Sequence, residues 1–258
     1  MHQQLMPNVE ILSEPGPFRM ADDWYQYATP DHFWIQWRFS AILRLLQDLD
    51  VGERLIEIGC GTGVARHQLE QHFQRPVEGC DLNPKALSSA TQGKGGLYLY
   101  NVHDRRPDWK AVFNCVFLLD TLEHIPDAVT FLESIRFHLK TNGLLVVNVP
   151  AVQALYSRYD KLAGHVKRYR QPLLAGELDE AGFRLIRSSY WGLTMLPVAM
   201  LRKILLKFVK AERVLSIGFQ PASRFTDSIL RFLMAAEMLL LRRPCCGTSL
   251  TAVAQRVD

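Results

Sequence analysis

The segment Arg54-Leu-Ile-Glu-Ile-Gly-Cys-Gly-Thr-Gly63 decides the fold of this chain. A short run of Leu and Ile enters a glycine turn, and the residues from Val64 onward repeat apolar side chains at helical spacing. A second run, Val77-Glu-Gly-Cys-Asp81, then ends on a carboxylate. This order of strand, glycine turn, helix and strand predicts a parallel α/β unit whose turn lets the backbone approach a nucleotide-like ligand.

The spacing of the glycines and of the acid indicates the class of ligand. A dinucleotide fingerprint, Gly-x-Gly-x-x-Gly, requires a glycine where this sequence has Val64, and the third glycine here is Gly63. Asp81 follows Gly59 by 22 residues, about the spacing at which an acid reaches ribose hydroxyls. A glycine turn alone would also fit an ordinary tight turn, but the flanking strand, helix and acid favour cofactor binding.

The segment 57–63 resembles motif I of the class I S-adenosylmethionine-dependent methyltransferases, and the resemblance extends over about residues 33–190. Segments 81–85, 117–127 and 140–143 are similar to later motifs of that family, although Asn101 replaces the family's usual Asp at the adenine contact. The resemblance implies S-adenosylmethionine as the cofactor. It also implies these cofactor-binding residues: Glu57, Gly59, Cys60, Gly61, Gly63, Asp81, Leu82, Asn101, Val102 and Asp120.

Apolar runs alternate with helical patterns beyond the first strand, as a doubly wound sheet requires. Strands are expected at 54–58, 76–80, 97–101, 112–118, 143–149, 183–189 and 249–255. The predicted fold is α/β: a Rossmann-like, seven-stranded methyltransferase sheet with helices on both faces. Its expected domains are an N-terminal helical cap at 1–48, a cofactor-binding core at 49–189, a helical insertion or lid at 190–247, and the last core strand at 248–258.

Candidate catalytic residues follow the fourth and fifth strands, because sites in open α/β sheets lie beyond the carboxyl ends of the strands. His124 could act as a base near neutral pH, or it could pack at the start of a helix. The stretch Asp160-Lys-Leu-Ala-Gly-His-Val-Lys-Arg-Tyr169 is similar to a branch of the family whose bacterial members are often associated with polyprenol-linked sugars, glycolipids or secondary metabolites. It supplies a possible base, an orienting carboxylate and a cation, or else a salt-bridged clamp for a loop: His165, Asp160, Arg168 and Tyr169.

The segment 190–247 is unusual, because the family normally has a short hairpin at this place. Residues 201–215 put Leu, Ile and Phe on one side and Lys and Arg on the other, and residues 229–241 are apolar apart from Arg231 and Glu237. Neither stretch reaches the ~18 uninterrupted apolar residues of a spanning helix. We expect two helices that form a basic-rimmed lid against a membrane surface or a greasy substrate, with pairing in a homodimer as the alternative.

Charge and cysteine usage bear on partners and compartment. The net charge of +4 divides into 13 basic against 18 acidic residues over 1–150 and 17 against 8 over 151–258. The basic half suits an anionic substrate, a nucleic acid or a membrane face, or is merely an unevenly charged soluble surface. The five cysteines show neither a Cys-x-x-Cys pair nor zinc spacing, so no metal is expected. A cytoplasmic location follows, with the inner face of the membrane as an alternative.

These features predict methyl transfer from S-adenosylmethionine to oxygen or nitrogen of a small-molecule, secondary-metabolite or lipid-linked acceptor. Two alternatives stay open: a tRNA methyltransferase, and a non-catalytic protein that keeps the cofactor fold for interaction. The sequence has no Asn-Pro-Pro-Tyr-type base-flipping motif, and its basic residues alternate with Leu, Phe and Met rather than forming a stripe. We therefore expect no nucleic-acid partner.

Overall fold

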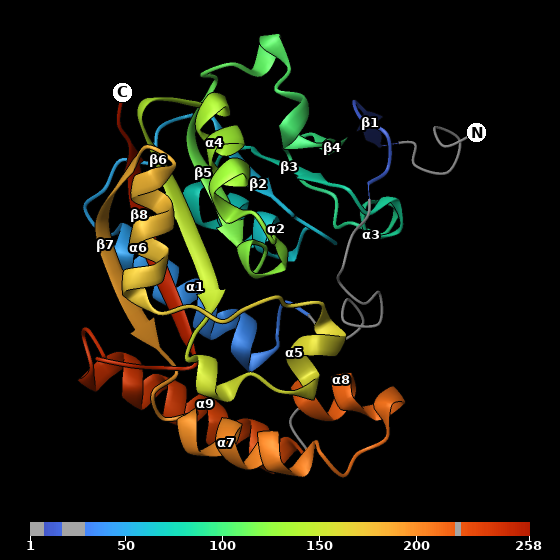
Figure 1. Ribbon diagram of the computed structural model, residues 1–258, viewed down its shortest axis with the longest axis vertical. Coiled ribbons are helices and arrows are strands. Elements are labelled where there is room, and N and C mark those ends of the chain that lie inside the picture. Colours follow the sequence, from blue (N-terminus) through green and yellow to red (C-terminus); the bar gives the residue numbers. More distant parts are fainter. Residues whose placement is uncertain (1–7, 17–28, 220–222) are drawn as a thin grey trace.

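The computed structural model describes residues 8–16, 29–219 and 223–258, and its centre is one eight-stranded sheet (Figure 1). The strands are β1 (Val9–Ile11), β2 (Leu55–Ile58), β3 (Val77–Asp81), β4 (Leu97–Leu99), β5 (Phe113–Leu119), β6 (Leu139–Pro150), β7 (Phe183–Trp191) and β8 (Ser249–Arg256). Their order across the sheet is β1-β4-β3-β2-β5-β6-β8-β7. Among these described strands, seven run in one direction and β8 runs in the opposite direction between β6 and β7. The predicted fold class is confirmed, and all seven expected strands are present.

The eighth strand, β1, was not expected from the sequence. It pairs with β4 at the edge of the sheet, with Val9 opposite Leu97 and Ile11 opposite Leu99. Three residues are too few to show the alternation by which a strand is recognised in a sequence. In the predicted N-terminal cap, residues 1–7 and 17–28 lie outside the described residues, and helix α1 (Phe33–Leu46) is the helical part that the structure describes.

Helices cover both faces of the sheet, because successive residues of a buried strand point to opposite sides. Leu55 of β2 packs on the side of α1 and α2 (Val64–Phe73), whereas Ile56 packs on the side of α4 (Ala128–His138) and α6 (Gln171–Glu180). Two short helices, α3 (Pro84–Ser88) and α5 (Arg158–Ala163), follow β3 and β6. Because the strands from β1 to β6 run parallel, the loops that follow them lie together at the carboxyl end of the sheet.

The insertion forms three helices in its described part, where two were expected: α7 (Leu196–Leu205), α8 (Ala211–Phe219) and α9 (Arg224–Leu240). The expectation of one amphipathic segment over 201–215 is wrong, because the chain turns at 206–210. The Arg158 guanidinium donates to the carbonyl oxygens of Leu206 at 3.0 Å and Val209 at 2.7 Å, which satisfies the end of α7. Leu206 at the start of the turn and Val214 on α8 pack in one small apolar cluster.

The insertion helices lie together at the end of the sheet toward which the β6 arrow points (Figure 1). Glu237 of α9 fixes them to the end of β7, since its carboxylate accepts hydrogen bonds from Gly192 N–H at 2.7 Å and Thr194 N–H at 2.8 Å. Within the described ranges, none of the helices combines the length and apolar character needed to cross a membrane.

Candidate active site

The loop between β2 and α2 is built from glycines in the left-handed backbone region. Gly59, Gly61 and Gly63 have φ angles of 76°, 53° and 72°. A Cβ atom on Gly59 would lie 2.4 Å from Oγ1 of Thr121, so the loop's approach to the end of β5 also requires glycine. The Gly59 N–H donates to the carbonyl oxygen of Cys80 at 2.8 Å, which ties the loop to β3.

Asp81, the last residue of β3, holds this loop through its carboxylate. Oδ2 accepts the Gly61 N–H at 2.8 Å, and Oδ1 accepts the Asn83 N–H at 2.8 Å. Burial raises the pKa of Asp81, whereas these backbone hydrogen bonds favour its ionised form. Each carboxylate oxygen keeps a further lone pair, so Asp81 can still accept hydrogen bonds from ligand hydroxyls.

A cavity of about 680 Å³, here called the cofactor cavity, lies against the loop. All but one of the predicted cofactor residues line it: Glu57, Gly59, Cys60, Gly61, Asp81, Leu82, Asn101, Val102 and Asp120. The exception is Gly63, which is absent from the wall and instead caps the start of α2 in a left-handed conformation. Asn101, where the family pattern has Asp, accepts the His103 N–H through Oδ1 at 3.1 Å.

Glu57 is a buried acid in the wall of the cofactor cavity. Its desolvation raises the pKa of this carboxyl to about 8. Among the described residues, Oε2 of Glu57 has no hydrogen-bond partner. A buried carboxyl with an unused acceptor fits a cationic ligand group, and S-adenosylmethionine carries both an ammonium and a sulfonium group. The residues present therefore fit that cofactor.

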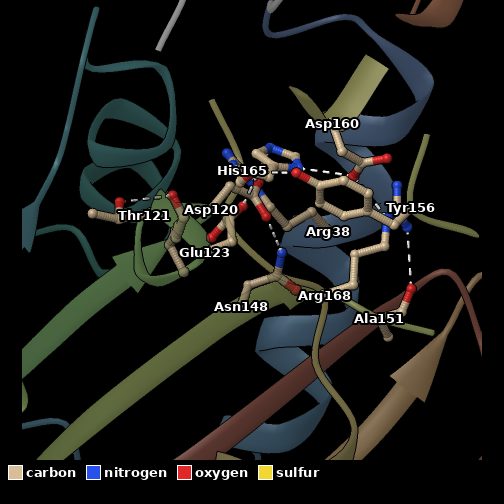
Figure 2. Close-up of polar contacts among 11 residues, drawn as sticks. Arg38, Asp120, Thr121, Glu123, Asn148, Ala151, Tyr156, Asp160, His165 and Arg168 are labelled. Carbon is tan, nitrogen blue, oxygen red and sulfur yellow. Dashed lines mark hydrogen bonds and ion pairs between the residues drawn. The ribbon is translucent and has the colours of Figure 1, made fainter. Parts of the chain in front are cut away.

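Asp120 stands at the end of β5 in a left-handed conformation and is held from two sides (Figure 2). Its Oδ2 lies 2.6 Å from Nη1 of Arg38 on α1, and its Oδ1 accepts a hydrogen bond from Nδ2 of Asn148 on β6 at 2.6 Å. The Asn148 Oδ1 in turn accepts from Trp191 Nε1 at 3.0 Å and from Thr251 Oγ1 at 2.8 Å. This network joins α1, β5, β6, β7 and β8 around one carboxylate.

A second cavity of about 510 Å³, here called the acceptor cavity, adjoins the first. Its walls are mainly apolar and come from α1, α5 and the insertion, including Phe33, Trp34, Leu201, Leu205, Ile229 and Leu233. One end is polar and contains Asp120, Glu123, His124, His165 and Arg168. Asp120 and His124 line both cavities, so a ligand in one cavity can meet a ligand in the other there.

His165, Asp160 and Arg168 form a cluster at this polar end (Figure 2). Nδ1 of His165 lies 2.9 Å from Oδ1 of Asp160, and Nε of Arg168 donates to the same oxygen at 2.7 Å. Burial of Asp160 opposes ionisation, yet the hydrogen bond from His165 and the charge of Arg168 together hold its pKa well below the usual range. The ionised Asp160 therefore orients the ring of His165.

Glu123 and His124 belong to a short 3₁₀ helix, η5 (Leu122–His124), that follows β5. The carboxyl of Glu123 is buried, and Oε1 lies 3.9 Å from Nε2 of His165. Desolvation and the nearby charge of Asp120 raise the pKa of Glu123 well above its ordinary value. The ring of His124 stands edge-on to that of His165, with centroids 4.9 Å apart.

Of the predicted catalytic residues, Asp160 and Tyr169 line neither cavity. Asp160 still contacts His165, whereas Tyr169 lies apart from it. The ring of Tyr169 is buried in the core beneath α6, and its hydroxyl donates to Oε2 of Glu177 at 3.1 Å. Burial, followed by the charge of Glu177, raises the pKa of Tyr169 far above its ordinary value. In this position Tyr169 supports the loop rather than touching an acceptor.

Arg38 and Asn148 hold Asp120 but are not among the site residues predicted from the sequence. Arg38 was not singled out, although a lone arginine inside the apolar stripe of the predicted helix was a usable signal. Asn148 lies in the expected strand 143–149 and was given no role. Glu123 lies in the segment 117–127 that resembles a family motif, and it too was given no role.

Glu123, His124 and His165 are also the group whose atoms come nearest to a metal-ligand set among the described residues. Their potential ligand atoms lie within 4.8 Å of one another. Zinc binds nitrogen and oxygen at about 2.0–2.2 Å, so two ligands of one ion are at most ~4.4 Å apart. These side chains would have to draw together to hold a cation, and His165 would then lose its free nitrogen.

Comparisons with known proteins identify similar methyltransferases. Residues 31–188 match the family model described as a methyltransferase domain. The chain is 27% identical over 143 residues to a ubiquinone biosynthesis O-methyltransferase of Haemophilus ducreyi, covering 50% of this chain and 60% of that protein. It is 33% identical over 120 residues to a trans-aconitate 2-methyltransferase of Deinococcus radiodurans, covering 43% of this chain and 45% of that protein. The matches thus span about half the length of these relatives.

A solved structure shows the same fold. The phosphoethanolamine N-methyltransferase 2 of Haemonchus contortus, in complex with phosphomonomethylethanolamine and S-adenosylhomocysteine, superimposes with a TM-score of 0.53 at 16% identity. The match covers 86% of this chain and 53% of that one. The family model spans more than half of this chain and contains both the glycine loop and Asp81. The chain therefore belongs to the methyltransferase-domain family of class I S-adenosylmethionine-dependent methyltransferases.

Proposed function

We propose that this protein transfers the methyl group of S-adenosylmethionine to an oxygen or nitrogen atom of an acceptor that enters the acceptor cavity. The observation that carries the proposal is the meeting of the two cavities at Asp120 and His124, with His165 beside them. When bound, S-adenosylmethionine supplies an electrophilic methyl group. The protein must then align the acceptor, exclude water and remove a proton where the acceptor carries one.

His165 is the group we assign to the proton. Its Nδ1–H faces Asp160, so Nε2 carries the lone pair; this tautomer is assigned from the hydrogen bond. With S-adenosylmethionine bound, the acceptor oxygen or nitrogen would form its bond to the methyl carbon while the carbon–sulfur bond broke and left its electron pair on sulfur. The acceptor's proton passes to Nε2 of His165, and the charge of Asp160 stabilises the resulting imidazolium. Arg168 keeps Asp160 ionised throughout.

The walls of the acceptor cavity support an acceptor with a sizeable apolar part. Leu201 and Leu205 of α7 line this cavity, yet 57% and 54% of their surfaces are exposed. The cavity is therefore open along its apolar side, and a chain longer than the cavity can extend outward. This favours a lipid-linked acceptor with a protic head group over a nucleic acid, because the aliphatic Leu side chains at this opening offer neither charge nor a flat stacking surface.

Transfer of a labelled methyl group tests the proposal. The protein, methyl-labelled S-adenosylmethionine and cell extracts separated into lipid, polar-metabolite and RNA fractions are incubated together. We expect label in the lipid fraction from the unaltered chain, and none from His165→Ala. Label in RNA alone would assign the tRNA alternative. If S-adenosylhomocysteine does not bind in a calorimeter and no fraction is labelled, the non-catalytic alternative holds.

A further inference from the structure

One face of α9 is apolar and exposed along its whole length. Phe225, Phe232 and Leu239 have 74%, 72% and 82% of their surfaces exposed, and their seven-residue spacing places them on one side of the helix. The opposite side packs against the aromatic cluster formed by α1 and the end of β7, through Leu230, Met234 and Met238. The exposed face is thus not the face that holds α9 to the protein.

The turn between α7 and α8 also exposes a large apolar side chain. Phe208 stands in the turn with 85% of its surface exposed, and Lys207 and Lys210 flank it. Helix α7 contributes further exposed apolar side chains, namely Val198, Met200, Leu201, Ile204 and Leu205. Large apolar residues presented together at a surface mark an interaction site. We call the exposed residues of α7, the turn and α9 the apolar face.

Cations accompany the apolar face. Residues 190–247 contain nine Lys and Arg against three Asp and Glu. Arg224 precedes Phe225, and Arg242 and Arg243 follow the exposed end of α9. Six exposed cations of this segment form no ion pair with any residue in the described ranges: Lys207, Lys210, Arg213, Arg224, Arg242 and Arg243. A partner that covers the apolar face must therefore also accommodate positive charge.

The apolar face is continuous with the acceptor cavity. Leu201 and Leu205 of α7 and Ile229 of α9 belong both to the cavity wall and to the exposed surface. Whatever covers the apolar face consequently covers the open side of the cavity. A second copy of the chain would bring two sets of unpaired cations together, whereas anionic lipid head groups complement them.

We propose that the apolar face docks on an anionic lipid membrane, so that the acceptor cavity opens toward the bilayer. The exposed Phe and Leu side chains enter the boundary between head groups and acyl chains, and the flanking Lys and Arg meet the lipid phosphates. The entry of an acceptor from the bilayer rests on the proposed function. The docking itself does not, because it needs neither cofactor nor acceptor and can be measured without them.

Vesicle flotation of the full chain tests the docking. The vesicles contain phosphatidylcholine alone or phosphatidylcholine mixed with phosphatidylglycerol. We expect binding to the mixed vesicles that weakens as salt is added. At about 1 kcal/mol per cation near the surface, Lys207→Gln with Lys210→Gln should lower the partition coefficient about 30-fold. Phe208→Ser should lower the partition coefficient about tenfold or more, because the phenyl ring that would be buried in the bilayer is lost.

Matched control variants lie elsewhere on the surface. Lys110→Gln removes an exposed cation beyond η4 (Pro107–Trp109), and Leu173→Ser removes an exposed apolar side chain on α6. Both should float like the unaltered chain, and all variants should bind S-adenosylhomocysteine with unchanged affinity. Retained cofactor affinity shows that a variant is folded, so a loss of flotation then reports docking alone.

Three results would overturn the docking proposal: no flotation, equal flotation with neutral and anionic vesicles, or equal losses in the control variants. Sedimentation identifies the rival occupant. A dimer that Phe232→Ser dissociates, together with absent flotation, assigns the apolar face to a second copy. Charge-dependent flotation without methyl transfer to the lipid fraction would instead retain the docking and reject the proposed function.

Discussion

Nδ1 of His165 lies 2.9 Å from Oδ1 of Asp160, and this contact decides which ring nitrogen faces the acceptor cavity. Arg168 occupies the same carboxylate oxygen at 2.7 Å and favours its ionised form. The pairing leaves the lone pair on Nε2 of His165, as the proposed role of base requires, and it gives the ring one orientation before any ligand binds. The same carboxylate also accounts for the buried cation of this loop, because Asp160 is the partner charge of Arg168.

Replacing His165 by Ala should lower the rate of methyl transfer by ~10²–10⁴, the usual loss when a general base is removed. Binding of S-adenosylhomocysteine should be unchanged, because His165 does not line the cofactor cavity. His124→Ala is the matched comparison, since its ring lies next to that of His165. If only the His124 variant is inactive, the base is His124. Normal turnover in both variants would leave catalysis to proximity alone.

Asp81→Ala should weaken cofactor binding by roughly 10- to 150-fold, since hydrogen bonds to a charged group contribute about 1.5–3 kcal/mol each. Titration calorimetry with S-adenosylhomocysteine measures this loss. Thermal unfolding must show that the variant remains folded, because Asp81 also holds the glycine loop through Gly61. Unchanged affinity in a folded variant would remove Asp81 from the cofactor site.

Binding of S-adenosylmethionine should release a proton from Glu57. The pKa of the free carboxyl is about 8, so most molecules carry this proton at pH 7. A cationic group placed against Glu57 favours the carboxylate, and affinity should therefore rise as the pH approaches 8. Calorimetry in buffers of different ionisation enthalpy measures the released proton. Glu57→Gln should abolish it, and an identical release from that variant would contradict the assignment.

Glu57 should also make stability depend on pH. Its folded-state pKa, about 8, exceeds the ordinary value of 4.5, so its contribution is fully present below about pH 4.5 and is lost as the pH rises toward 8. The free energy of unfolding of the cofactor-free protein should fall over this interval more steeply than that of Glu57→Gln. Denaturant titrations at pH 5 and pH 8 compare the two proteins. Parallel changes would show that Glu57 titrates normally.

Asp160→Asn should destabilise the protein by about 3–5 kcal/mol, because it leaves Arg168 buried without its partner charge. The lowered pKa of Asp160 means that its contribution is present above the unfolded value near 4 and is lost as the pH falls below it. The difference in the free energy of unfolding between the variant and the unaltered protein should therefore decrease toward pH 2. Asp179→Asn, an exposed control on α6, should change the free energy of unfolding by no more than about 0.5 kcal/mol.

A chelator should leave methyl transfer unchanged. The ligand atoms of Glu123, His124 and His165 are spread over as much as 4.8 Å, and Nε2 of His165 is assigned to the proton. Activity is measured before and after dialysis against ethylenediaminetetraacetate, with the metal content checked by mass spectrometry. Activity lost on dialysis and restored by one divalent ion would make His165 a ligand instead of the base.

The parts of the site that could be predicted from the sequence are the parts made locally. The glycine turn and Asp81 lie within one strand–helix–strand unit, where positive φ angles require glycine and parallel pairing brings the ends of β2 and β3 together. The strands could also be predicted, because strands that are buried on both faces have continuous apolar sequences. The three-residue strand β1 could not be predicted, since so short a segment shows no alternation of apolar and polar residues.

Contacts between distant segments could not be predicted, because periodicity does not say which loops meet. Arg38 reaches Asp120 from 82 residues away, and His165 reaches Glu123 from a loop beyond another strand. The position of the turn at 206–210 likewise depends on Arg158, which accounts for the wrong expectation of a single amphipathic segment. These contacts decide the shape of the acceptor cavity.

The sequence by itself determined the fold, the cofactor loop and the composition of the loop from Asp160 to Tyr169, because all three follow from local backbone and burial patterns. Only the tertiary structure decided which side chains of that loop face the acceptor. Tyr169 pairs as an isolated bridge with Ala151, and neighbouring residues of extended backbone point in opposite directions. Arg168 therefore points to the acceptor cavity and Tyr169 to the core. The sequence alone does not show which of the two neighbours points to which side.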